Sequence, residues 1–346
     1  MNKLVVINVL SKWHLYCAEA YLSSINTDMN NNHRVVAFIH YHVPSKNFRV
    51  QESDFNYTYL LDSKPSINFI KTSGEQKTVL RKVMSEELYS TLVMISPRQM
   101  NLYQVLPTMP IRKREYILVD EGIGNYYSRK LWNLESMALG NNLNKIMYIK
   151  QLIKKAVVST ICHHTTRWGL LKEGNKGWEP QDDVAASMRK YFDNYVKKII
   201  DIDANKIEGD CVYLSDNLGI MVSEPEYEFD FYRMVYLAIR ERYNSSNVWF
   251  KPHPNEKNRI GFIDRIKKIG FQVYEDTYAY ENLCNSFSFF SFGLCSSSLL
   301  NGAVIFQRDV FSFSQTIKKD SLNEYGQRRI EEFQNITKNV SGLTRI

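Results

Sequence analysis

Short apolar runs alternate with helix-periodic stretches along most of this chain, and this alternation limits the possible folds more than any other feature. In the first half, predicted strands cover residues 3–10, 33–43, 90–96 and 114–122, and a predicted helix covers residues 13–25. Parallel strands need long crossover connections, which are usually helices. The pattern therefore predicts an α/β fold with a parallel sheet.

A second series of the same kind follows a charged helical stretch at residues 183–202. Its predicted helices cover residues 227–243, 260–270 and 280–287; its predicted strands cover residues 210–219, 247–254, 271–276 and 302–309, and a strand runs into a helix over residues 287–302. We therefore expect two Rossmann-like domains, residues 1–205 and 206–346, facing a central cleft, with the last helices packing back on the first domain. Ligands of such folds bind outside the carboxyl ends of the strands.

Composition excludes several classes of protein. Of the 346 residues, 44% are hydrophobic and 23% are charged, as in folded globular proteins. The net charge of +7 suits an anionic substrate or membrane surface, but no nucleic-acid-binding signature accompanies it, so no nucleic-acid partner is expected. The five cysteines have no metal or redox spacing and are predicted to be buried thiols of a reducing compartment: Cys17, Cys162, Cys211, Cys284 and Cys295.

The location is predicted from what the hydrophobic segments lack. The first apolar run is interrupted at Asn8 and has no cleavage-site pattern, so it is predicted to be a strand and not a signal peptide. No segment approaches the roughly 18 apolar residues that span a bilayer. We expect a cytoplasmic protein. A basic amphipathic stretch at residues 141–161, with Lys145, Lys150, Lys154 and Lys155, is compatible either with peripheral contact to an anionic membrane or with packing on its own domain.

The sequence Lys251-Pro252-His253-Pro254 follows a predicted strand. Proline on both sides stiffens the backbone around the histidine and removes two amide donors. An imidazole held beside a lysine suits binding or protonation of a phosphate. Alone, such a pair is more often a turn histidine bonded to backbone.

Two acidic residues, Asp120 and Glu121, end another predicted strand just before Gly122. Adjacent side chains on an extended strand point to opposite faces, so at most one readily enters a given site. A carboxylate there can act as general base toward an alcohol, or it can be a turn or helix N-terminal acid. The following Gly-Ile-Gly lacks the third glycine of a dinucleotide fingerprint, which excludes NAD.

Three serines, Ser296, Ser297 and Ser298, stand at a predicted strand-to-helix junction, where hydroxyls and free amides can bind an anion or cap the helix. Glu281 opens a short predicted helix; it can accept from ribose hydroxyls or simply favour the helix N-terminus. Two metal-like patterns are set aside. Residues 201–203 lie in a helix or linker, and residues 162–164 are contiguous and cannot all face one ion. No metal or cofactor is expected.

Together, the order and spacing of these motifs resemble those of bacterial sialyltransferases. Glu281 lies 28 residues after His253, and the serines lie 15 to 17 residues further on. The capsule polysialyltransferase and lipooligosaccharide sialyltransferase families share an acidic pair before glycine, a His-Pro motif and paired serines on a two-domain GT-B fold. The resemblance implies inverting, metal-independent transfer of sialic acid from CMP-sialic acid to a glycan hydroxyl, in capsule, O-antigen or lipooligosaccharide synthesis.

The resemblance also implies residue roles. Glu121, or otherwise Asp120, is the general base, and His253 contacts the donor phosphate and protonates the leaving group. Lys251 and two of the three serines, Ser296, Ser297 and Ser298, bind the phosphate, with Ser297 and Ser298 as the preferred pair. Glu281 holds the cytidine ribose, the loop from Ser215 to Gly219 begins the nucleotide domain and contacts the donor, and Gly122 and Asn125 lie on the acceptor side.

Other readings remain open. The donor can be another CMP-activated nonulosonic acid or Kdo. A CDP-alditol phosphotransferase of teichoic-acid type also carries His-Pro and paired-serine motifs, although it typically has a second such histidine. A membrane-associated, glycan-binding partner of a polysaccharide assembly complex is the non-enzymatic alternative.

Overall fold

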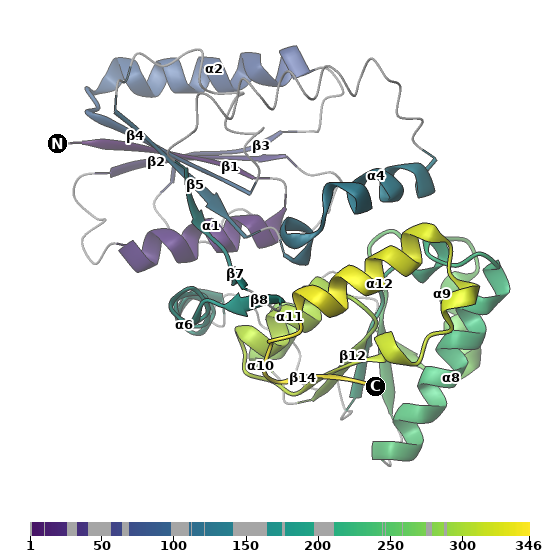
Figure 1. Ribbon diagram of the computed structural model, residues 1–346. Helices are drawn as coiled ribbons and strands as arrows, with labels where there is room; N and C mark the ends of the chain where they lie inside the picture. Colours follow the sequence, from purple (N-terminus) through teal and green to yellow (C-terminus); the bar gives the residue numbers. More distant parts are fainter. Residues whose placement is uncertain are drawn as a thin grey trace. The chain divides into compact units, whose positions relative to one another are not determined.

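The chain forms two compact units in the computed structural model (Figure 1). The structure describes residues 2–9, 11–25, 33–40, 57–63, 69–97, 111, 113–120, 122–140, 165–174, 177–196, 211–243, 245, 247–257, 259–274, 279–286 and 289–346. The first unit contains Met1–Glu121, Asn144–Leu170 and Asp182–Ile199; the second contains Gly122–Leu143, Leu171–Gln181 and Ile200–Ile346. The domain boundary predicted near residue 205 lies outside the described residues.

The first unit is built on a six-stranded parallel sheet in the order β3-β2-β1-β4-β5-β6. Its strands are β1 (Lys3–Val9), β2 (His33–His40), β3 (Tyr57–Ser63), β4 (Thr91–Ser96), β5 (Lys113–Val119) and β6 (Thr165–Trp168). Two helices, α1 (Lys12–Ile25) and α2 (Phe69–Glu86), cover its two faces (Figure 1). The α-helix α6 (Asp182–Tyr191) packs on α1 and continues as a π-helical turn, Phe192–Val196.

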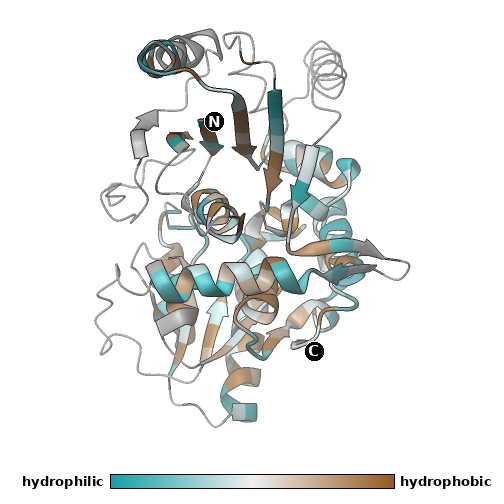
Figure 2. Cartoon of the chain, turned by 90° about the vertical axis from the view of Figure 1, so that its left-hand side faces the viewer, coloured by the Kyte–Doolittle hydropathy of each residue, from teal (hydrophilic) through white to brown (hydrophobic). Residues whose placement is uncertain are grey.

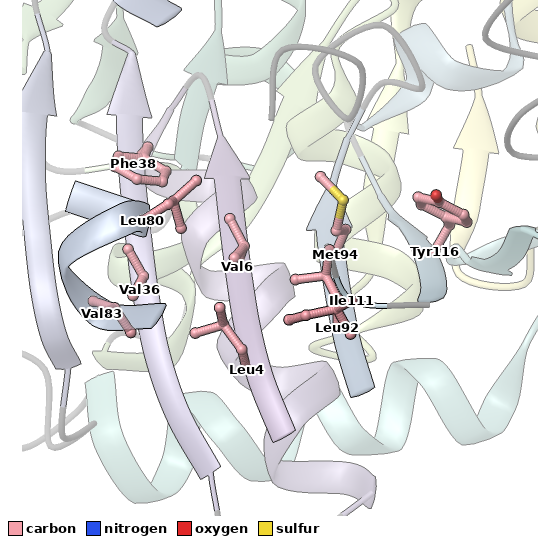
Figure 3. Packing of buried hydrophobic residues seen from close by; sticks show 10 residues of the cluster. All are labelled: Leu4, Val6, Val36, Phe38, Leu80, Val83, Leu92, Met94, Ile111 and Tyr116. Carbon is pink, nitrogen blue, oxygen red and sulfur yellow. The ribbon is translucent and has the colours of Figure 1, made fainter. Parts of the chain in front are cut away.

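The core under α2 follows the alternation of the strands. Leu4 and Val6 of β1 point to one face of the sheet. Every second side chain of the neighbouring strands β2 and β4 points to the same face and packs against them. Leu80 and Val83, three residues apart on α2, meet this face (Figure 3). The cluster consists of Leu4, Val6, Val36, Phe38, Leu80, Val83, Leu92, Met94, Ile111 and Tyr116.

The second unit repeats the architecture with a sheet of order β11-β10-β9-β12-β13-β14, again entirely parallel. Its strands are β9 (Cys211–Leu214), β10 (Val248–Lys251), β11 (Gln272–Val273), β12 (Phe290–Gly293), β13 (Val310–Ser312) and β14 (Leu343–Arg345). Its α-helices are α4 (Arg129–Ala138), α8 (Pro225–Tyr243), α9 (Phe262–Ile269), α10 (Tyr280–Ser286), α11 (Ser297–Val304) and α12 (Glu324–Ile336).

Aromatic side chains fill much of this second core. Tyr213 of β9 stacks on Phe250 of β10, with ring centroids 5.7 Å apart, and Tyr232 of α8 meets Phe250 edge-on at 5.1 Å. Such arrangements add to the free energy gained from burial alone. In Figure 2, which is coloured by hydropathy, the helices carry both hydrophobic and hydrophilic residues, and hydrophobic residues are prominent in the strands.

Both sheets have the strand order of a Rossmann fold, with the third strand in sequence at one edge and the first strand beside the fourth. In the second unit the order therefore reverses between β9 and β12, and the crevice outside their carboxyl ends is the place where such folds bind ligands. The predicted α/β fold with two Rossmann-like domains is confirmed.

Two short segments from the first half of the chain belong to the second unit. One contains a 3₁₀ helix, η3 (Ile123–Tyr126), and α4, which packs on α12. The other is an antiparallel hairpin of β7 (Leu171–Gly174) and β8 (Gly177–Pro180), and β8 also contacts α12. The residues that follow the acidic pair are therefore packed with the C-terminal sheet.

One predicted element is wrong. Residues 302–309 were expected to form a strand, but Gly302–Val304 end α11, and the strand follows at Val310–Ser312. Gly302 lies within the helix at a close contact, where the hydroxyl of Tyr280 and a methyl of Val310 leave no room for a larger side chain. Periodicity alone does not separate a short buried helix from a strand.

The cysteines and hydrophobic segments fit the sequence analysis where the structure describes them. Cys17, Cys211, Cys284 and Cys295 are buried free thiols, and Cys162 lies outside the described residues. Within the described ranges, no helix combines the length and the apolar character that crossing a bilayer requires.

Candidate functional site

Most of the predicted donor-side residues lie at the carboxyl ends of three adjacent strands in the second unit. Ser215 follows β9, Lys251 ends β10 and is followed by His253, and the serine triplet follows β12 at the start of α11. Because β10, β9 and β12 are neighbours in the sheet, three motifs that are far apart in sequence reach one edge. This edge includes the switch point between β9 and β12.

Asp216 joins the two strand ends at the switch point. Its Oδ2 accepts hydrogen bonds from the amides of Leu294, at 3.1 Å, and Cys295, at 3.0 Å. Its Oδ1 lies 3.7 Å from the guanidinium of Arg329 on α12. Burial raises the pKa of Asp216, while Arg329 and the two amides oppose that shift. The loop after β9 is thus attached to the segment that leads into the serines.

The imidazole of His253 is half-buried and fixed by its own turn. The amide of Asn255 donates to Nδ1 at 3.3 Å, so a neutral ring carries its proton on Nε2. Burial lowers the pKa of His253 to about 4, and the positive charges of Arg329 and Lys251 add to this shift. At neutral pH the ring is therefore neutral, with Nε2–H as a hydrogen-bond donor.

Lys251 ends β10, two residues before His253. Burial and, to a smaller extent, repulsion from Lys257 lower the pKa of its ammonium to about 8, and Glu281 opposes this shift. The side chain therefore remains mostly charged at neutral pH. Its Nζ also lies 6.0 Å from the ring centroid of Tyr274.

Glu256 attaches the loop that carries His253, residues 252–257, which we call the HP loop. Its Oε2 accepts from the amide of His253 at 2.8 Å. Its Oε1 accepts from the hydroxyls of Ser215, at 2.9 Å, and Tyr232, at 3.2 Å. A backbone bond of 3.0 Å from the amide of Ser215 to the carbonyl of Lys251 joins the same two strand ends. The predicted binding residue Ser215 is thus a buried member of this network.

The serine triplet forms the first turn of α11. Ser296 caps the helix, because its Oγ accepts from the amide of Ser298 at 3.3 Å. The hydroxyl of Ser298 donates to Oε1 of Glu281 at 3.4 Å, and the amide of Asn301 donates to the same oxygen at 2.8 Å. Glu281 is therefore held beside the serines.

The glycine of the acidic motif contacts the serine motif directly. The amide of Ile123 donates to Oγ of Ser297 at 3.1 Å, which leaves the hydroxyl hydrogen of Ser297 available to a ligand. A Cβ atom on Gly122 would lie only 2.9 Å from that Oγ. Gly122 has φ 93° and ψ −166°, a conformation that is essentially restricted to glycine. Two motifs 174 residues apart in sequence are thus in contact.

Further bonds attach the segment after Gly122 to the second unit. Ser128, which caps α4, donates from its amide to Oε2 of Glu332 at 2.6 Å, and its hydroxyl bonds the other oxygen of Glu332. Tyr325 donates to Glu135 of α4 at 3.0 Å. Both partners, Tyr325 and Glu332, lie on α12, which therefore holds this segment in place.

The two candidate bases differ in what the structure describes. Asp120 is buried, and its Oδ2 accepts from the amide of Leu170 at 3.0 Å, which ties the end of β5 to the second residue after β6. Glu121 lies outside the described residues.

Asn125, predicted on the acceptor side, lies in η3 of the second unit, where its amide donates to the carbonyl of Gly122 at 3.1 Å. Gly219 packs against the ion pair of Arg259 and Glu228.

Three polar residues of this edge were missed by the sequence analysis. Asp216 lies in the loop from Ser215 to Gly219, and Glu256 lies two residues after the His-Pro motif. Both resemble ordinary loop residues in the sequence, because only the structure shows that they are buried. Arg329 carried no sequence signal, because it comes from a helix beyond all the motifs. Burial opposes its charge, but neighbouring acidic groups, Cys295 first, raise its pKa, so the guanidinium stays charged.

No group of three or more His, Cys, Asp or Glu side chains within the described ranges is arranged to hold a metal ion. The two metal-like patterns, residues 162–164 and 201–203, lie outside those ranges, as does the basic stretch at residues 141–161.

Solved structures with similar folds show the type of fold first. UDP-GlcNAc 2-epimerase from Methanocaldococcus jannaschii is 10% identical with a TM-score of 0.53, over 99% of this chain and 88% of that one. The UDP-N-acetylglucosamine 2-epimerase from Rickettsia bellii is 14% identical with a TM-score of 0.49, over 99% and 89%. A sialyltransferase from Photobacterium damsela is 11% identical with a TM-score of 0.48, over 100% and 81%. At such identities the first similarity shows the fold alone, which is of the predicted GT-B type.

The family follows from the sequence model that matches. The chain belongs to the alpha-2,8-polysialyltransferase family, whose model matches residues 3–315. By overall sequence comparison, no curated protein matches it. The predicted resemblance to bacterial sialyltransferases is confirmed, and the protein is a glycosyltransferase of this type. The match ends before α12, so Arg329 lies outside it.

Replacing Gly122 by alanine tests the contact between the acidic and serine motifs. We expect Gly122→Ala to lower the free energy of unfolding by about 1–3 kcal/mol, because alanine is strained in this backbone conformation and its Cβ meets Ser297. Gly124→Ala is the matched control, since its Cβ would meet only Trp132, at 3.2 Å. Urea denaturation measures both; equal stability of the two variants would contradict the contact.

Proposed function

We propose that the protein transfers sialic acid from CMP-sialic acid to a hydroxyl of a glycan acceptor, with inversion at the donor carbon and without a metal. The observation that supports this proposal best is the set of donors at the switch-point edge: Lys251, His253 and the hydroxyl of Ser297. Ser298 lies beside them, with its hydroxyl bonded to Glu281. Family membership supports the sialyl group. The donor phosphate is assigned to this edge because helix N-termini and strand ends of this kind bind phosphates.

The edge can compensate the phosphate charge with its own side chains. The Nε2–H of neutral His253 donates to a phosphate oxygen, and the ammonium of Lys251 adds a positive charge. As the bond between the sugar carbon and the phosphate oxygen breaks, negative charge grows beside the ring. The negative charge of the phosphate raises the pKa of His253, so the ring takes up a second proton from water and becomes an imidazolium; this ion gives its Nε2 proton to the leaving cytidine monophosphate and returns to the neutral ring. In this proposal Glu281 accepts from the cytidine ribose hydroxyls.

Glu121 is proposed as the general base. The acceptor oxygen forms the new bond to the sugar carbon while its proton passes to the carboxylate of Glu121. Asp120 is less suited to this role, because its buried carboxylate already accepts from the amide of Leu170. Base and leaving group on opposite faces of the sugar give inversion.

Two substitutions test the assigned roles. We expect His253→Ala and Glu121→Ala each to leave folding intact and to lower transfer roughly 100-fold or more, because each removes an acid–base group. Asp120→Asn, which retains an acceptor oxygen for the Leu170 amide, is the matched control for the base. Product formation is measured by mass spectrometry, and folding by circular dichroism. Near-native turnover of both variants would reject these assignments.

Donor hydrolysis separates the proposal from its enzymatic alternatives. Incubated with CMP-sialic acid and a panel of lactosides and sialosides, the protein is expected to release cytidine monophosphate and to extend an acceptor by a sialyl residue. Parallel incubations contain CMP-Kdo and CDP-glycerol. Turnover of CDP-glycerol with release of glycerol phosphate, and none of CMP-sialic acid, would identify a phosphotransferase instead.

Peripheral attachment to anionic membranes is proposed from the sequence of residues 141–161, where lysines alternate with apolar residues. We expect the protein to co-sediment with liposomes that contain an anionic lipid and to remain in solution with neutral ones. Substitution of Lys145, Lys150, Lys154 and Lys155 by glutamine should abolish binding, because each lysine near an anionic surface contributes about 1 kcal/mol. Unchanged sedimentation would reject the attachment.

A further inference from the structure

We propose that Glu256 is a positioning residue for donor transfer: its carboxylate fixes the HP loop to the end of β9 and to α8, and thereby orients the imidazole of His253. The proposal rests on the proposed function for its catalytic meaning. Its structural content, that Glu256 determines the environment of His253, can be tested without any transfer reaction.

The bonds of Glu256 form a complete set for a fully buried carboxylate. The side chain has 0% exposure, and its two oxygens accept from the His253 amide, the Ser215 hydroxyl and the Tyr232 hydroxyl. The first bond holds the loop backbone at the catalytic residue itself. The other two bonds reach the end of β9 and the middle of α8, which belong to the rigid part of the unit.

The turn transmits this attachment to the ring. The amide of Glu256 donates back to the carbonyl of His253 at 2.9 Å, so the backbone at both ends of the turn is fixed. Between them, the amide of Asn255 donates to Nδ1 and sets the ring orientation and tautomer. If the carboxylate no longer reached the His253 amide, this backbone donor would lack an acceptor, and the turn would have to move toward water to satisfy it. The hydroxyls of Ser215 and Tyr232 use the other oxygen, and they also lie 2.9 Å from each other.

The surrounding charged groups have other partners. Glu228 and Arg259 form a bidentate ion pair with two contacts of 2.7 Å. From α8 and β9, the phenols of Tyr232 and Tyr213 also face Glu256. Burial and, to a smaller extent, repulsion from Glu228 raise the pKa of Glu256 to about 7, although the hydrogen bonds from Ser215, His253 and Tyr232 oppose this shift. We therefore assign the role of Glu256 to the positions of its hydrogen bonds and not to its charge.

Glutamine and aspartate at this position separate geometry from charge. Glutamine has the same length, and its oxygen can accept from the His253 amide while its NH₂ donates to the two hydroxyls, which can rotate to accept. Aspartate keeps the charge but is one methylene shorter and cannot reach both sets of partners. A positioning role predicts that Glu256→Gln resembles the wild type and that Glu256→Asp does not.

Stability as a function of pH provides a second readout. Because the folded-state pKa of Glu256 is raised from 4.5 to about 7, the folded protein binds this proton more tightly than the unfolded chain. The corresponding stability is present at low pH and is lost as pH rises through about 7. Glu256→Gln cannot titrate, so its urea midpoint should fall less than that of the wild type between about pH 5 and 7.5.

The deciding experiment is an NMR titration of the histidine side chains in the whole protein, with His253 assigned from the spectrum of His253→Gln. We expect the His253 pKa to be about 4 in the wild type and in Glu256→Gln, and to rise toward its usual value of about 6.5 in Glu256→Asp and Glu256→Ala. Tyr232→Phe is the control, because it removes one bond to Oε1 and leaves the bond to the His253 amide. A His253 pKa that is unchanged in Glu256→Asp, or raised in Glu256→Gln alone, overturns the proposal.

Kinetics then connect the result to the proposed function. In Glu256→Asp, kcat/KM for CMP-sialic acid should fall roughly 10- to 100-fold, as for a displaced catalytic group, with the acceptor KM unchanged. Glu256→Gln should stay within about threefold of the wild type. If the wild type shows no transfer while the His253 pKa responds as described, the proposed function fails and the positioning role stands. If transfer in Glu256→Asp is normal, the positioning role fails.

Discussion

The second unit of this protein depends on a buried carboxylate at the switch point of its sheet. Asp216 bridges the ends of β9 and β12 through two backbone amides and is compensated by Arg329. A buried charge is costly unless it is paired and hydrogen-bonded, and removing one partner of such a pair destabilises a protein by about 3–5 kcal/mol. The bridge therefore fixes where the serine turn begins relative to the loop that follows β9.

A second buried acid extends the same principle to the neighbouring strand. Glu256 connects the HP loop to Ser215, which stands next to Asp216, so the ends of β10, β9 and β12 are joined in one row by two acids. Neither acid needs to touch a substrate for this purpose. Together they hold a neutral imidazole, an ammonium and the first turn of α11 at a common edge, which an anionic donor requires from a preorganised site.

The sequence predicted the candidate site residues better than it predicted the buried residues that hold them in position. Lys251, His253 and the serines stand out because they follow predicted strands, and Glu281 because it opens a predicted helix; the structure brings the strand ends that carry the first three groups to one edge of the sheet. Glu256 lies within the same motif as His253 but resembles an ordinary turn residue until its burial is known. The strand predicted at residues 302–309 is wrong because a short apolar run has no period long enough to distinguish helix from strand.

What the sequence by itself determined is local: which segments alternate between apolar strand and amphipathic helix, and which ends carry acids, hydroxyls and an imidazole. Those features depend on neighbours within a few residues, since backbone geometry fixes the periods of side-chain direction. Only the tertiary structure decided that Gly122 lies against Ser297, and that α12 supplies Arg329 to the bridge at Asp216. Such contacts depend on the order of strands in the sheet and on which buried polar groups satisfy one another, and no local pattern specifies either.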